Sequence, residues 1–489
     1  MNIKIMIRIQ GWILLLETIF MLPALLIAVV TKDRPATLGF LGAMAIALAC
    51  ALGMAFYSRN ADRKFYAREG LVCTGVAWIV LSAIGALPFF ISGRIPNYVD
   101  AFFEIVSGFT TTGASILPDV EVMGKAILYW RSFSHWVGGM GVLVFFLAII
   151  PANGRSNAYM LHILRAESPG PSVSKMVPRM RETAAILYII YCALTVADIV
   201  FLLIGKMPVF DAFCIAFGTA GTGGFGVLNS SCGAYTPFAQ NVTTVFMLLF
   251  GVNFSIYYLL LMRRFFDAFR DEELRMYLTI VAFAILVITI NVFHKTVNTQ
   301  HLGESVRHAA FQVASIITTT GYSTVDFDIW PTLSKGILLC LMFVGASAGS
   351  TGGGIKVSRI LLLLKNIRRN ARQIFHPYEV QIIRMNGQRV AEQTMTNVSG
   401  YLAAYVIIVI VSFLLLSADR ANFSITTNFS SVMATFNNIG PGYEAVGPTS
   451  NYAAYSNFSK IVMSIDMLLG RLEIFPIIAI FSPSTFRRR

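Results

Sequence analysis

The chain contains four stretches with one plan: DAFFEIVSGFTTTGAS at residues 100–115, DAFCIAFGTAGTGGFG at 211–226, RHAAFQVASIITTTGYS at 307–323 and TNFSSVMATFNNIGPG at 427–442. Each stretch begins as a semi-apolar segment of helical character and ends in a polar triplet and a glycine. Each is too short to cross a bilayer, which takes about 20 residues of helix, and each lies between two longer apolar stretches. Self-similarity of this kind marks a structural repeat. The repeat unit is a helix, a re-entrant half-helix with its loop, and a second helix.

The spacing within the four repeats also matches. The loops align on one glycine each, namely Gly113, Gly223, Gly321 and Gly440. The helix that follows each loop has a glycine of its own, 24 to 30 residues further on, namely Gly138, Gly251, Gly345 and Gly470. Matched distances in four copies indicate repeats that are equivalent in space.

These repeats predict the fold class, an all-α membrane protein. Four pseudo-symmetric helix–pore loop–helix repeats would surround one central pore, and an N-terminal two-helix hairpin would bring the number of spans to ten. The predicted segments are the hairpin with its basic cytoplasmic loop (1–70), pore repeat 1 (71–150), pore repeat 2 (183–262), pore repeat 3 with an interrupted final helix (275–365) and pore repeat 4 (394–489).

The composition agrees with a chain that faces lipid. Of its 489 residues, 56% are hydrophobic and only 13% are charged, whereas a typical soluble domain has about 25% charged residues. The net charge of +13 comes from Lys and Arg that fall in alternate loops and at the C-terminus. This positive-inside pattern predicts a multi-pass protein with both termini in the cytoplasm, and it does not indicate a nucleic-acid partner.

The loops have the chemistry of a site for a monovalent cation. Their Thr, Gly and Asn residues offer carbonyl and hydroxyl oxygens and no fixed charge. Rings of backbone carbonyls can replace the hydration shell of such an ion, and charged side-chain rings serve other pores. Each half-helix would also direct the negative end of its dipole toward the loop. Packing of helices through small residues is the alternative for any single TTTG, but four copies favour a pore.

These loops, with GASAGSTGGGIKVSR at 345–359 and MLLGRLEIFP at 467–476, resemble the Trk/Ktr/HKT superfamily of potassium transporters over nearly the whole chain. The N-terminal hairpin resembles its bacterial Trk branch. The resemblance implies potassium and rubidium uptake across the bacterial cytoplasmic (inner) membrane, with potassium bound in the pore and no other cofactor in this chain. It assigns the selectivity filter to Thr111, Thr112, Gly113, Gly221, Thr222, Gly223, Thr319, Thr320, Gly321, Asn438, Ile439 and Gly440.

The resemblance also bears on selectivity and on partners. Serine at the first filter glycine goes with sodium permeation in part of the family, so Gly113 implies potassium. The family's membrane subunit is a homodimer that works with a cytosolic nucleotide-binding regulatory ring. The short basic loops of this chain and its lack of a GxxxxGK[ST] motif agree with a separate regulatory subunit.

The final helix of the third repeat is interrupted by GASAGSTGGGI at 345–355, before a lysine. Each glycine in a helix costs about 1 kcal/mol relative to alanine. A tight helix crossing is one interpretation. The other, which the resemblance supports, is an unwound intramembrane loop that gates the path beneath the filter. The predicted gate residues are Gly345, Gly349, Ser350, Gly352, Gly353, Gly354, Lys356 and Arg471.

Arg471 lies in the last membrane helix, with Asp466 and Glu473 nearby. A charge in a membrane helix is a functional candidate by default, and a structural pair with one of these carboxylates is the alternative. Matching of the repeats puts Arg471 level with Gly139, just below the filter. There it would raise the barrier to permeating cations and could hold the interrupted loop through its carbonyls.

Two other classes of function fit less well. A secondary transporter, coupling proton or sodium movement to a potassium or other solute load, also has broken helices and internal repeats, although usually two repeats. An enzyme would need a convergent nucleophile or metal cluster, and the six His and six Cys residues form no such motif. The chain is therefore predicted not to be an enzyme. Passive and coupled ion flow both remain open.

Overall fold

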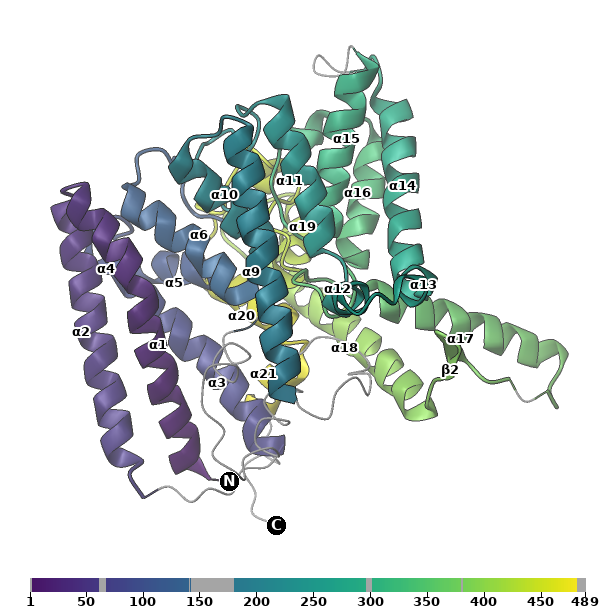
Figure 1. Ribbon diagram of the computed structural model, residues 1–489, viewed down its shortest axis with the longest axis horizontal. Coiled ribbons are helices and arrows are strands. Elements are labelled where there is room, and N and C mark those ends of the chain that lie inside the picture. Colours follow the sequence, from purple (N-terminus) through teal and green to yellow (C-terminus); the bar gives the residue numbers. More distant parts are fainter. Residues whose placement is uncertain are drawn as a thin grey trace.

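Helix is the main secondary structure of the computed structural model, which describes residues 2–60, 67–139, 141, 180–295, 301–379 and 381–481. Long helices stand side by side, with the N-terminal hairpin at one edge and α17 sloping outward at the other (Figure 1). Two-residue strands β1 (Arg384–Met385) and β2 (Gln388–Arg389) form a small antiparallel hairpin. The predicted all-helical membrane fold is thus confirmed in its general form.

The N-terminal hairpin consists of α1 (Ile3–Val30) and α2 (Arg34–Tyr57). Asp33 is the N-cap of α2, and its side chain accepts a hydrogen bond from the backbone N–H of Ala36 at 3.2 Å. Neighbouring segments approach α2 closely, α1 near Ala51 and the chain at residues 88–92 near Gly39, because the buried face of α2 carries mostly small residues. These residues are Ala36, Gly39, Ala43, Ala47 and Ala51.

The same three elements occur in the same order in each repeat. The first helices are α3 (Ala67–Gly85), α9 (Met180–Ile204), α14 (Glu272–Val292) and α18 (Glu392–Ser417). The half-helices are α5 (Tyr98–Phe109), α10 (Val209–Gly221), α15 (Leu302–Ile317) and α19 (Ile425–Phe436). The second helices are α6 (Lys125–Gly139), α11 (Pro237–Phe250), α16 (Thr332–Val344) and α20 (Asn457–Arg471).

Shorter elements connect these units. They are α4 (Leu87–Ile91), α12 (Phe254–Leu261), α13 (Phe265–Arg270), α17 (Val357–Phe375), α21 (Phe475–Phe481), η2 (Phe327–Ile329) and η3 (Glu444–Val446). Apart from the amphipathic α17, each spans at most eight residues.

The four repeats follow one another in a closed ring. The second helix of each repeat packs against the half-helix of the next: α6 on α10, α11 on α15, α16 on α19, and α20 back on α5. The largest apolar cluster runs across the last of these junctions, because it joins the hairpin and repeat 1 to repeat 4. Each half-helix is therefore held by the helices of its own repeat and by the second helix of the preceding repeat.

Six helices of the described residues are long and apolar enough to cross a membrane, and a seventh candidate is the pair α11 and α12, bent by 89°. The second helices of the other repeats fall short of that length. The second helices of repeats 3 and 4 are interrupted, so helix length does not show whether they cross the membrane. The prediction of ten spans is therefore not tested for these two repeats. In repeat 1 the continuation of α6 lies largely outside the described residues.

The breaks themselves are more general than the sequence indicated. An interruption was expected in repeat 3 alone, but α11 and α20 also end beside the matching glycines, Gly251 and Gly470. A Cβ atom at Gly470 would lie well under 3.0 Å from the carbonyl oxygen of Phe436, and one at Gly138 equally close to that of Phe109. The second helix thus meets the end of the half-helix with no room for a side chain.

The close approach at Gly138 predicts a severe effect of one methyl group. Gly138→Ala would force the backbone of α6 away from Phe109, and we expect a loss of about 3 kcal/mol or more in the free energy of unfolding. Gly336→Ala is the matched control, because it too places alanine in a second helix but meets nothing within 4 Å. Thermal unfolding of the purified variants would measure both, and equal stability would contradict the packing argument.

Candidate ion-conduction site

The loops after the four half-helices share one backbone conformation. In each, a residue with a positive φ of 56° to 58° comes directly before a turn residue whose N–H bonds, at 2.8 Å, to the carbonyl five positions back. The residues of positive φ are Thr111, Thr222, Thr319 and Asn438. The turn residues that follow them are Thr112, Gly223, Thr320 and Ile439. Positive φ is unusual for threonine, and such strained backbone is concentrated at functional sites.

The register of repeat 2 differs by one residue from the sequence alignment. A glycine of positive φ stands two positions after the strained residue in every loop: Gly113, Gly224, Gly321 and Gly440, with φ of 80°, 77°, 83° and 99°. Gly224 therefore occupies the place that the alignment gave to Gly223. Gly221, predicted as a filter residue, is instead the last residue of α10, packed against the backbone of His135.

The four glycines touch the neighbouring loops in cyclic order. A Cβ atom on any of them would lie under 3.0 Å from the carbonyl oxygen of the next loop's turn residue. The pairs are Gly113 with Gly223, Gly224 with Thr320, Gly321 with Ile439, and Gly440 with Thr112. The loops thus close a ring of backbone contacts. Seven of the twelve predicted filter residues make these contacts, and four more are the residues of positive φ in the same loops.

The side chain of His135, on α6, packs against the second loop and hydrogen-bonds to it. Its Nε2 accepts the backbone N–H of Phe225 at 3.3 Å, and its Nδ1 lies 2.7 Å from the carbonyl oxygen of Gly108. Because a backbone N–H only donates, the ring proton is on Nδ1, which donates to Gly108. A Cβ on Gly223 would collide with the imidazole. These contacts make His135 a bridge between α5 and the second loop.

A buried ion pair supports the first loop. Arg131 donates through Nε to Glu104 at 2.7 Å, and both side chains are at most 2% exposed. Glu104 also accepts from the backbone N–H of Ile116 and the hydroxyl of Ser115, each at 2.9 Å. The guanidinium lies 4.1 Å from the ring centre of Phe225, in repeat 2. This pair was not predicted from the sequence. Two opposite charges in apolar segments could have indicated it, because charged side chains within membrane segments usually pair with one another.

The segment from Gly345 to Ile355 lies directly against the loop ring. Gly353 donates its N–H to the hydroxyl of Thr319 at 2.6 Å, and a Cβ at Gly352 would lie 2.8 Å from the carbonyl oxygen of Thr318. Gly345, Gly349 and Gly354 have φ of 70°, 70° and 78°, and the Lys356 ammonium donates to Gly352. Ser350 donates to the carbonyl of Ser347 at 2.6 Å. The segment is unwound and mostly buried, so it is more than a tight helix crossing.

One carboxylate ties the unwound segment to the start of α17. Glu273, in the first turn of α14, accepts the backbone N–H groups of Ala348 at 2.6 Å and of Ser358 at 3.1 Å through the same oxygen. Just beyond the segment, Arg359 pairs with Glu473 at 2.5 Å, which ties α17 to the break after α20. Neither contact was predicted from the sequence, because the partners are 75 or more positions apart.

Arg471 joins the unwound segment to the loop ring. It donates to the carbonyls of Thr351 at 2.7 Å and of Gly138 and Gly139, each at 2.6 Å, and to the hydroxyl of Thr111 at 3.2 Å. The level predicted for Arg471, beside Gly139, matches these contacts. The two carboxylates considered as partners bond elsewhere: Glu473 pairs with Arg359, and Asp466 accepts from Ser412 at 2.7 Å.

Together these features define a multi-pass helical membrane protein in which four half-helices deliver strained loops into one buried ring. The comparisons with known proteins are consistent with that class. The TrkH family model, described as a cation transport protein, matches residues 39–488. The chain belongs to this family.

Its relatives match over their full lengths. The chain is 36% identical over 493 residues to the Trk system potassium uptake protein TrkH of Salmonella typhimurium, covering 100% of both chains. It is 32% identical over 486 residues to TrkG of Escherichia coli, covering 98% of both. The crystal structure of the potassium transporter TrkH from Vibrio parahaemolyticus superimposes with a TM-score of 0.87, at 32% identity and with 100% of both chains covered.

The buried pair behind loop 1 yields a stability prediction. Glu104→Gln leaves the guanidinium of Arg131 buried without its counter-charge, and we expect a loss of about 3–5 kcal/mol. The double variant Glu104→Leu/Arg131→Met removes both charges and should recover most of that loss. Asp267→Asn is the control, because it breaks an exposed pair with Arg264 and should cost less than about 1 kcal/mol. If thermal unfolding showed that Glu104→Gln loses no more stability than Asp267→Asn, this prediction would be contradicted.

Proposed function

We propose that this chain carries potassium, and rubidium with it, into the cell through a selectivity filter formed by the four loops. The observation that supports this most directly is the cyclic glycine-to-carbonyl contact, because it gathers four equivalent backbone segments in one place. The similar proteins named as potassium uptake proteins support the choice of ion. The proposed filter residues are Thr111–Gly113, Thr222–Gly224, Thr319–Gly321 and Asn438–Gly440.

The chemistry of these residues suits a monovalent cation. The loops offer backbone carbonyls and threonine hydroxyls, which can substitute for the water around potassium. No carboxylate occurs in the four triplets. The C-terminal ends of α5, α10, α15 and α19 lead into the loops, so their partial negative charge favours a cation there.

We propose further that residues 345–355 and Arg471 gate this path. The unwound segment contacts the third loop through Gly353 and is held by Arg471 through Thr351. A guanidinium beside the filter raises the electrostatic barrier for a cation. Moving the segment would require exchange of these hydrogen bonds together with its bonds to Gly251 and Phe250.

The remaining features of the proposal come from the family resemblance and from the charge pattern. We propose a protein of the bacterial inner membrane with both termini in the cytoplasm. We also propose a homodimer and a cytosolic nucleotide-binding regulatory ring as partner. A secondary transporter that couples proton or sodium movement to the potassium load is the second candidate. Broken helices also occur in that class, and the pair α11 and α12, bent by 89°, is the observation that it would use.

Substitution at the first filter glycine tests the proposed filter. Serine at Gly113, where φ is 80° and the carbonyl oxygen of Gly223 leaves no room for a Cβ, should distort the ring. We expect sodium to inhibit rubidium-isotope uptake more strongly in proteoliposomes that contain Gly113→Ser than in proteoliposomes that contain the wild-type protein. Gly93→Ser is the control, because Gly93 also has a positive φ of 69° but meets nothing within 4 Å. An unchanged ion preference in folded Gly113→Ser protein would argue against the filter.

Removal of the Arg471 guanidinium tests the proposed barrier. We expect Arg471→Ala to raise rubidium uptake about tenfold, which corresponds to about 1.4 kcal/mol of barrier. Arg471→Lys keeps the charge and should stay near the wild-type rate. A variant that lacks residues 349–354 serves as an opened reference, with uptake at least as high as that of Arg471→Ala. Reduced uptake in a correctly folded Arg471→Ala protein would refute the barrier role.

A further inference from the structure

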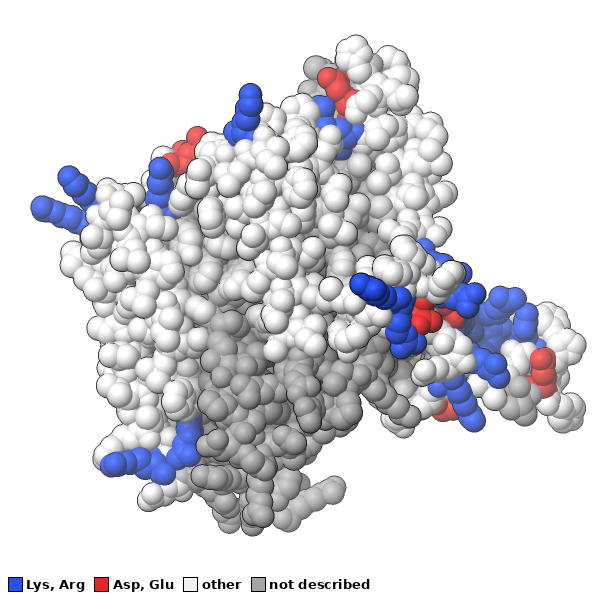
Figure 2. Space-filling model, viewed as in Figure 1, with Lys and Arg blue, Asp and Glu red and all other residues white. Residues whose placement is uncertain are grey.

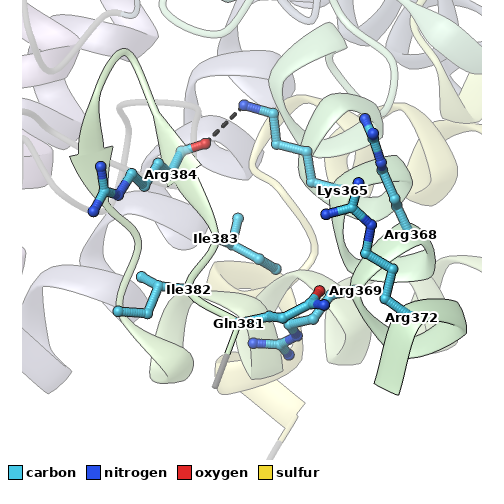
Figure 3. Close-up of a pocket in the computed structure, with 8 residues that line it drawn as sticks. All are labelled: Lys365, Arg368, Arg369, Arg372, Gln381, Ile382, Ile383 and Arg384. Carbon is cyan, nitrogen blue, oxygen red and sulfur yellow. Dashed lines mark hydrogen bonds between the residues drawn. The ribbon is translucent and has the colours of Figure 1, made fainter. Parts of the chain in front are cut away.

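A basic groove lies outside the conduction site, between α17 and the β1–β2 hairpin. Its lining consists of cationic and apolar side chains from the helix and from the facing strand, and it encloses about 280 Å³. Figure 3 shows Lys365 reaching across the groove to the carbonyl oxygen of Arg384. The lining residues are Lys365, Arg368, Arg369, Arg372, Gln381, Ile382, Ile383 and Arg384.

The groove is held in shape by anchors at both walls. Lys365 forms an ion pair with Glu272 and donates to the carbonyl oxygen of Arg384 at 2.7 Å. At the hairpin tip, Asn386 accepts the N–H of Glu272 at 2.9 Å and donates to Asp271 at 2.6 Å. The hairpin is therefore fastened to the start of α14, and the groove is a built feature of the fold.

The charge in this groove is only partly neutralised. Arg369 pairs with Glu392 at 2.7 Å, as Lys365 does with Glu272. Arg368 and Arg372 are exposed and, among the residues that the structure describes, form no ion pair. Like charges three and four positions apart on a helix repel one another. An anion between them would relieve this repulsion.

An apolar stripe runs along α17 beside the basic one. Its members Leu364, Ile367, Ile374 and Phe375 are 52%, 63%, 76% and 79% exposed. The helix slopes away from the upright α14 and α16, at the end of the molecule where α14 begins (Figure 1). Lys and Arg gather over the same region (Figure 2). A helix with adjacent basic and apolar stripes has the pattern of a membrane-interface helix.

We propose that this groove binds the phosphate headgroup of an anionic phospholipid, with its acyl chains along the apolar stripe. Arg368 and Arg372 would hold the phosphate, since guanidinium groups bind it through paired hydrogen bonds. Ile367 and Ile374 would contact the chains. The orientation proposed above puts α17 at the cytoplasmic leaflet, where anionic lipids attract basic segments. A free phosphate would use the cations alone and leave the apolar stripe without a role.

Lipid binding to the purified full-length protein tests this site without any measurement of ion flux. Native mass spectrometry in neutral detergent would give the affinity for phosphatidylglycerol. Because each cation near an anionic headgroup strengthens binding about fivefold, Arg368→Gln/Arg372→Gln should weaken it on the order of thirtyfold. Both residues are exposed and outside the anchoring ion pairs, so the fold should be kept. The charge-preserving Arg368→Lys/Arg372→Lys should bind within a few-fold of wild type.

Three comparisons make the result specific. Arg263→Gln/Arg270→Gln removes the same charge from exposed residues of the neighbouring basic segment, and it should leave phosphatidylglycerol binding nearly unchanged. Phosphatidylcholine should not compete. Equal weakening in both double glutamine variants would overturn the proposal in favour of general charge attraction. So would displacement by inorganic phosphate at equal concentration, or loss of a dimer in Arg368→Gln/Arg372→Gln with lipid binding intact.

Discussion

The contact between a glycine of one loop and a carbonyl of the next is the constraint on which the rest of the structure depends. It occurs four times in cyclic order, and at none of the four places is there room for a Cβ atom. The glycine of each loop packs against a carbonyl of the next loop, and a carbonyl of each loop packs against the glycine of the preceding one. No loop can therefore shift without moving its two neighbours. The half-helices that deliver the loops must therefore be fixed from outside, and the cyclic packing of the second helices supplies that support.

The supports differ between repeats, although the loops are alike. Repeat 1 has a buried ion pair, Glu104 with Arg131, and repeat 2 is braced by the imidazole of His135. Repeat 4 is held by Asn438, whose amide donates to Thr112 at 3.0 Å and to the carbonyl of Met467 at 2.9 Å. Strained backbone persists only where surrounding contacts over-determine it. One loop conformation with several different supports indicates that the fold requires the conformation itself and not any particular support.

The fold was largely predictable from the repeats, whereas the site was predictable only in outline. Apolar length and matched spacing are local signals, so the helices, the half-helices and the interrupted segment at 345–355 could be located. The register of repeat 2 could not be predicted, because GTGGFG contains two adjacent glycines, Gly223 and Gly224. Only the contact with the carbonyl of Thr320 shows that Gly224 is the equivalent of the glycines in the other loops. The clamp by Glu273 was missed for a similar reason, since its two bonds reach 75 and 85 positions along the chain.

The position of Arg471 connects these observations. Its guanidinium bonds to the loop of repeat 1, to the helix end at Gly138 and Gly139, and to Thr351 of the unwound segment. These acceptors come from repeats 1 and 3, and three of the four are backbone carbonyls at or beside a helix break. Helix ends leave such groups unsatisfied. The cation therefore satisfies oxygens at the helix breaks, and the same breaks that let the loops meet also bring a fixed charge against the ring that the loops form.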